Sequence, residues 1–143
     1  QAFKKLHKLP HTIYRDHNLL YKYVLIQVYT DTFFLKYIYK YGYISYVGGG
    51  MSNNGLHNIL EPAVFSCPVI IGNNYKGYNE AEDLIKLGGA FSVKDAVEFS
   101  KVFNSLNDSE KNRQRSGEVN LNYIIKNAEK NSLVLESLTE NLH

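Results

Sequence analysis

The residues of this chain whose types and spacing could do chemistry lie between positions 48 and 61. Three consecutive glycines, Gly48, Gly49 and Gly50, end an apolar run, and such a turn lets backbone amides approach an anion closely. Asn58 and Glu61 are three residues apart, so on a helix they project to the same side. A carboxylate beside an anion site suits a sugar hydroxyl that donates to it. The spacing favours a nucleotide site, although a tight turn in a crowded core and the polar face of a surface helix explain the same residues.

Short apolar runs and the helical patterns between them must position these residues. Strands are predicted at residues 24–28, 43–47, 69–71 and 90–93, with a weaker one at 12–14. Helices are predicted at residues 1–9, 32–41, 79–87 and 97–106. Residues 108–142 are predicted to form one or two terminal helices, with Leu121, Ile124, Ile125 and Ala128 facing inward. Because strands joined by crossover helices are almost always parallel, the sequence predicts an α/β, Rossmann-like parallel sheet with flanking helices. Such a sheet places the glycine turn at its carboxyl edge.

One further helix follows the glycine turn, and its apolar residues recur at helical spacing. They are Leu56, Ile59, Leu60, Ala63, Val64 and Cys67, while the opposite side carries His57, Asn58 and Glu61. Since proline fits only the first turn of a helix, Pro62 indicates that the regular helix begins close to Asn58 or later. The positive end of this helix would then face a phosphate bound at the glycine turn. We interpret Cys67 as a buried structural cysteine, and Glu80, Glu82 and Asp83 as the solvated first turn of the next helix.

Composition excludes several classes of protein. The chain has 143 residues, the size of one domain, and a formal net charge of +2, which is too small to predict a nucleic-acid partner. The basic, tyrosine-rich first third could bind single-stranded nucleic acid, but ordinary amphipathic packing explains its composition as well. No apolar run is long enough to span a membrane. One cysteine and five scattered histidines give neither a disulfide framework nor a zinc spacing, so no metal and no cofactor are expected.

The stretch from residue 43 to residue 93 closely resembles the C-terminal domain of 3-deoxy-D-manno-octulosonic acid (Kdo) transferase, a glycosyltransferase of lipopolysaccharide biosynthesis. The resemblance rests on five motifs: YVGGG at 46–50, GLHNILEPA at 55–63, PVIIG at 68–72, NYK with its acidic helix at 74–83, and LGGAFSV at 87–93. The most specific of them is the HNxLEP element that begins at His57.

The resemblance implies a GT-B enzyme, in which two Rossmann-like domains enclose the active site. Residues 1–143 would form a partial C-terminal, CMP-sugar-binding domain, with the N-terminal acceptor domain absent. The whole enzyme would transfer Kdo from CMP-Kdo to a lipid A precursor, with inversion and without a metal, at the cytoplasmic face of the bacterial inner membrane. Contact with the membrane surface would be made by the absent part. We expect the fragment alone to be soluble and inactive, and we assign it no catalytic residue.

The resemblance also implies which residues bind the donor. The family's CMP contacts fall on Asn58, Ile59, Leu60 and Glu61, beside His57 and the glycine turn. A second contact loop of the family falls on Thr32, Phe33 and Phe34, which depart from its usual Gly-Glu pattern. Two other functions remain open. The chain could be a non-catalytic nucleotide-binding or interaction module of GT-B-like fold, or part of a GT-B enzyme that uses a UDP-sugar.

Overall fold

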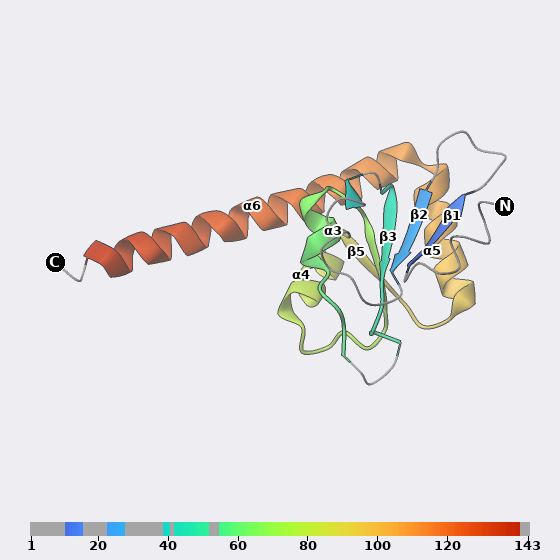
Figure 1. Ribbon diagram of the computed structural model, residues 1–143, viewed down its shortest axis with the longest axis horizontal. Helices are drawn as coiled ribbons and strands as arrows, with labels where there is room; N and C mark the ends of the chain where they lie inside the picture. Colours follow the sequence, from blue (N-terminus) through green and yellow to red (C-terminus); the bar gives the residue numbers. More distant parts are fainter. Residues whose placement is uncertain (1–10, 16–22, 28–38, 41, 52–54, 141–143) are drawn as a thin grey trace.

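A computed structural model describes residues 11–15, 23–27, 39–40, 42–51 and 55–140, with side chains from Tyr39 to residue 132. Its elements are β1 (His11–Arg15), β2 (Tyr23–Gln27), β3 (Ile44–Val47), α3 (Leu60–Val64), β4 (Val69–Gly72), α4 (Asn79–Leu87), β5 (Ala90–Val93), α5 (Ala96–Asp108) and α6 (Glu110–Glu140). The strands form a sheet between layers of helices, and the far part of α6 extends beyond the sheet (Figure 1). The α/β fold class is therefore as predicted.

The strands lie in the order β1-β2-β3-β4-β5. From β2 to β5 each strand is parallel to the next, with Val24 opposite Ile44 and Val69 opposite Ala90. This confirms the predicted direction of the four main strands. The weaker strand is β1, which pairs with β2 in the antiparallel direction. Because β2 to β5 are parallel, the turns that follow β3, β4 and β5 meet at one edge of the sheet.

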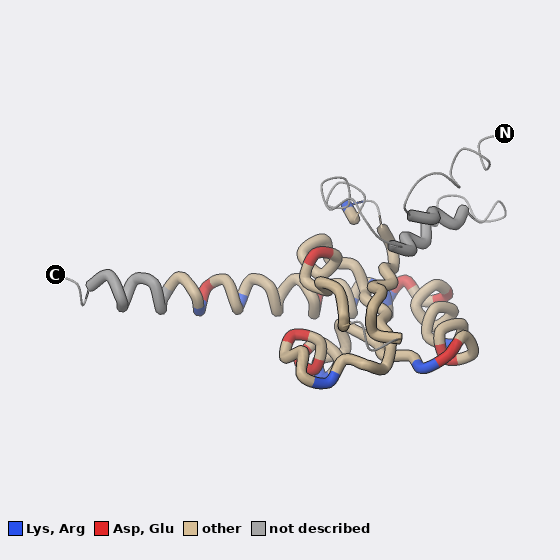
Figure 2. The backbone as a smooth tube through the Cα atoms, turned by 60° about the horizontal axis from the view of Figure 1, so that its bottom comes forward, with Lys and Arg blue, Asp and Glu red and all other residues tan. Residues whose placement is uncertain are grey.

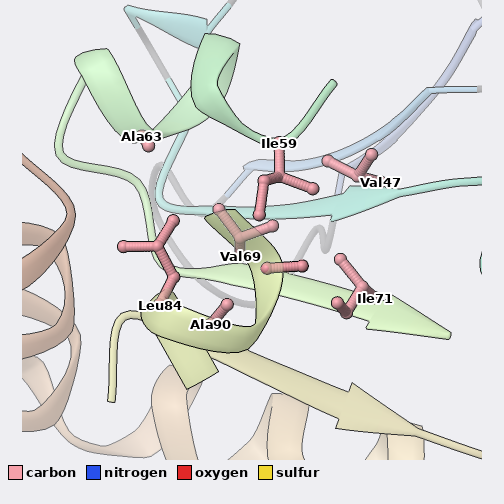
Figure 3. Close-up of a cluster of buried hydrophobic side chains, with 8 residues drawn as sticks. Val47, Ile59, Ala63, Val69, Ile71, Leu84 and Ala90 are labelled. Carbon is pink, nitrogen blue, oxygen red and sulfur yellow. The ribbon is translucent and has the colours of Figure 1, made fainter. Parts of the chain in front are cut away.

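The core lies on both faces of the sheet. On one face, α3 and α4 cover a cluster that includes Val47, Val69, Ile71 and Leu84 (Figure 3). On the other face, α5 covers a second cluster around Ile70. Successive residues of β4 thus point to opposite faces, and all four are buried, as is typical of a strand inside a parallel sheet. This two-sided burial holds the carboxyl edge of the sheet in place.

The helix after the glycine turn is shorter in the structure than its apolar pattern predicts. α3 spans only Leu60–Val64, and Val64 is 46% exposed. The start is as expected, since the helix begins after Asn58 with Pro62 in its first turn. The end comes early because Ser66 takes a left-handed φ of 56° and the amide of Cys67 donates to the carbonyl of Pro62 at 3.2 Å. The chain must turn there to enter β4.

The prediction for the inward face of α6 is wrong at two of four positions. Leu121 and Ile124 are half-buried, whereas Ile125 and Ala128 are exposed. The residues that dock α6 are small or polar: Ser116, Gly117 and Asn120. A side chain at 117 would collide with the carbonyl of Ser66, so glycine allows the helix to approach closely. The Asn120 amide then donates to the carbonyls of Cys67 at 2.6 Å and Gly89 at 2.9 Å.

Some predictions lie outside the described residues. They concern the helix at 1–9, all of the helix at 32–41 except Tyr39 and Lys40, the last residue of the strand at 24–28, and the loop with Thr32, Phe33 and Phe34. In the part that the structure does describe, no helix is long and apolar enough to cross a membrane. Lysines and arginines are scattered among acidic residues there, so both signs of charge lie side by side (Figure 2).

Cys67 is buried, as predicted, with 1% of its surface exposed. Its thiol lies 3.0 Å from the carbonyl of Gly42, and burial raises its pKa to about 11. Because the thiolate is the reactive form, we expect native Cys67 to react with Ellman's reagent at pH 8 about a hundredfold more slowly than in urea. The absorbance of the released thiolate follows both rates. Equal rates would show that the thiol is accessible in the folded chain.

Candidate functional site

The glycine turn follows β3 at the carboxyl edge of the sheet and is closely packed. Gly49 has a left-handed φ of 91°, and a Cβ on Gly50 would lie 3.1 Å from the nitrogen and the oxygen of Gly72, at the end of β4. The turn also holds two neighbouring loops. The amide of His57 donates to the carbonyl of Gly48 at 3.2 Å, and the amide of Asn74 donates to that of Gly50 at 2.8 Å. Close packing therefore accounts for Gly49 and Gly50, and the turn places His57 at the sheet edge.

Asn58 and Glu61 project to the same side, as their spacing predicts. The amide of Asn58 donates to Oε1 of Glu61 at 3.3 Å, and its oxygen accepts from the backbone N–H of Leu60 at 3.0 Å. Asn58 thus satisfies one of the free N–H groups at the start of α3. Because this N–H group is already bonded and α3 has only five residues, the start of the helix is a weaker phosphate site than the sequence predicted.

A pocket of about 160 Å³ lies beside this loop. The loop and the start of α3 contribute Leu56, His57, Asn58, Ile59 and Leu60, and the start of α4 contributes Tyr78, Glu80 and Ala81. Four of the predicted donor-binding residues, His57 to Leu60, therefore meet in one pocket. Glu61 and the glycine turn adjoin this group through Asn58 and His57 but do not line the pocket.

Tyr78 and Glu80 are pocket residues that the sequence analysis missed. Tyr78 is 38% exposed, and its hydroxyl lies against Gly55, where an added Cβ would come within 2.8 Å of it. Glu80 is exposed, as expected for a first-turn residue, yet it also lines the pocket. One signal was present in the sequence: both residues come soon after the carboxyl end of β4, at the edge where the glycine turn lies.

Glu61 lies near a buried tyrosine. Phe65 follows Glu61 by four residues, and its ring stacks on that of Tyr39 with 6.5 Å between the centroids. Tyr39 is 1% exposed. Burial raises the pKa of its phenol far above the usual value, and the negative charge of Glu61 raises it further. The Glu61 carboxylate thus accepts from the Asn58 amide and acts electrostatically on a phenol that stays protonated.

Comparison with known proteins finds the family that the motifs indicated. The chain is 40% identical over 65 residues to 3-deoxy-D-manno-octulosonic acid transferase of Aquifex aeolicus, covering 45% of this chain and 18% of that protein. It is 28% identical over 95 residues to the protein of the same name from Haemophilus influenzae, covering 65% and 22%. The resemblance stated from the motifs is confirmed. The chain spans about a fifth of the length of these curated relatives.

Two further comparisons bear on fold and family. The C-terminal CMP-Kdo binding domain of WaaA from Acinetobacter baumannii superposes with a TM-score of 0.54 at 23% identity, covering 60% of this chain and 46% of that one. This likeness confirms the Rossmann-like fold. A bifunctional glycosyltransferase/methyltransferase of Fusobacterium nucleatum is 32% identical over 79 residues, covering 54% of this chain and 12% of that protein. No protein-family profile matches the chain.

Proposed function

We propose that this chain is the donor-binding domain of a Kdo transferase, the enzyme that transfers Kdo from CMP-Kdo to a lipid A precursor in lipopolysaccharide biosynthesis. One observation carries the proposal. The His57–Leu60 segment of the most specific motif lines a pocket at the carboxyl edge of a parallel sheet, where α/β folds bind nucleotides. Relatives that share the motif region bear the name of this enzyme. Residues 1–143 then form part of the C-terminal domain of a GT-B protein whose acceptor domain lies outside them.

Different residues of this site contact different parts of the donor. We assign contacts with the donor, CMP-Kdo, to His57, Asn58, Ile59 and Leu60, next to the glycine turn, and we retain Thr32, Phe33 and Phe34 as a second contact loop. Glu61 accepts from the ribose hydroxyls. Its Oε1 accepts from Asn58, and because a carboxylate has two acceptor oxygens, Oε2 remains available to the ribose.

The reaction we propose for the whole enzyme is a direct displacement at the anomeric carbon of Kdo. A carboxylate of the acceptor domain takes the proton of the lipid A hydroxyl, the new C–O bond forms, and the bond to the CMP phosphate breaks. The configuration inverts, and no metal takes part. This domain holds the departing CMP, and the acceptor domain meets the lipid at the cytoplasmic face of the inner membrane. The chain itself contributes no catalytic residue.

Titration calorimetry with CMP and UMP tests the proposed function. We expect saturable binding of CMP to the chain and at least about tenfold weaker binding of UMP, a difference of about 1.4 kcal/mol. Tighter binding of UMP would favour a GT-B enzyme that uses a UDP-sugar. Binding of neither nucleotide would contradict the proposal and favour an interaction module.

A further inference from the structure

The pocket beside α3 is too small for a whole nucleotide sugar. Its volume is about 160 Å³, whereas pockets that enclose a drug-sized ligand measure about 300 to 1,000 Å³. A space of this size accepts one ring or one polar chain of a larger ligand. If the donor binds at this edge of the sheet, as the proposed function requires, only one part of it enters the pocket.

The side chains of the pocket select which part that is. Among the lining residues that the structure describes, the polar ones are His57, Asn58, Tyr78 and Glu80, and none is a lysine or an arginine. A carboxylate repels a phosphate, so the pocket disfavours the charged centre of the donor. A carboxylate accepts hydrogen bonds, while a phenol and an amide both donate and accept, and this is the combination that a row of sugar hydroxyls requires.

Two of these polar side chains lie against neighbouring groups. The Tyr78 hydroxyl lies against Gly55, and the backbone N–H of Tyr78 donates to the carbonyl of Tyr75 at 3.1 Å. The Asn58 side chain is hydrogen-bonded to the backbone N–H of Leu60 and to the carboxylate of Glu61. Because Asn58 lines the pocket and also contacts Glu61, the pocket adjoins the carboxylate that we assign to the ribose. A nucleotide sugar can therefore contact the pocket with its sugar and the Glu61 carboxylate with its ribose.

We propose that this pocket is the subsite for the hydroxyl groups of the donor's sugar, with Glu80 as the charged acceptor and Tyr78 as a second contact. The inference rests on the proposed function and extends it to residues outside the HNxLEP motif. Since Kdo is itself an acid, the hydroxyl-bearing end of the sugar enters the pocket and its carboxylate points away from Glu80.

The test compares CMP with CMP-Kdo as ligands of the chain and of its Glu80→Gln and Tyr78→Phe variants. In titration calorimetry we expect CMP affinity to stay within about twofold of the parent for both variants. We expect CMP-Kdo affinity to fall about tenfold for Glu80→Gln, which loses a charged acceptor, and about threefold for Tyr78→Phe. Glu118→Gln removes the same charge from an exposed position on α6 and should leave both affinities unchanged. Each variant is compared with the parent at matched melting temperature.

The outcomes separate the two proposals. Unchanged CMP-Kdo affinity in both variants overturns the sugar subsite, and so does an equal loss for CMP and CMP-Kdo, which would place the nucleotide in the pocket. A parent chain that binds neither ligand overturns the proposed function. Loss of CMP-Kdo affinity alone supports both proposals.

Discussion

Replacing Glu61 with glutamine is expected to weaken CMP binding about tenfold to a hundredfold, with little change in stability. In the role that we propose for Glu61, the variant loses a charged acceptor for the ribose, and a hydrogen bond to a charged group contributes about 1.5 to 3 kcal/mol. Glutamine still offers an oxygen to the Asn58 amide, and Glu61 packs in neither hydrophobic cluster. The free energy of unfolding should therefore change by less than about 0.5 kcal/mol. Calorimetric titration of CMP and a urea melt measure the two quantities.

A second ligand shows whether the ribose is the partner of Glu61. The parent should prefer CMP to 2′-deoxy-CMP, and the Glu61→Gln variant should lose most of that preference. Glu118→Gln again serves as the charge-matched control. If parent and variant bind CMP equally, Glu61 takes no part in the site and Asn58–Glu61 is only a helix cap.

Replacing Gly72 with alanine is expected to destabilise the chain by about 3 kcal/mol, because the new Cβ would meet backbone rather than a flexible side chain. It would collide with the carbonyl group of Gly50 and with the nitrogen of Met51. Neither strand end can move easily, since the Gly50 carbonyl also accepts from the amide of Asn74 at 2.8 Å. The measurement is the midpoint of urea unfolding with an unchanged m-value.

Gly77→Ala is the matched control for this substitution. Gly77 has a left-handed φ of 89°, but a Cβ there would meet nothing within 4 Å. We expect it to cost about 1 to 2 kcal/mol from backbone strain alone. A Gly72→Ala variant that is no less stable than Gly77→Ala would show that the contact between the two strand ends does not hold the glycine turn.

Much of the fold could be predicted from the sequence because it depends on local patterns. α4 and β5 occupy the predicted residues, 79–87 and 90–93, since an apolar period ends at Gly88, which adopts a left-handed φ of 86° and caps the helix. The direction of β2 to β5 follows from their crossover connections. The contact between Asn58 and Glu61 follows from their spacing of three residues.

Contacts between distant segments were decided only by the tertiary structure. The apolar pattern of α6 predicted that Ile125 and Ala128 face inward. Instead, Gly117 lets the helix pack closely against Ser66, and Asn120 donates to the carbonyls of Cys67 and Gly89. Tyr78 and Glu80 likewise join the loop before α3 only because β3 and β4 are neighbours and their carboxyl ends lie together. Periodicity records which side of an element is apolar, whereas the depth to which each residue is buried depends on how closely the neighbouring backbone can approach.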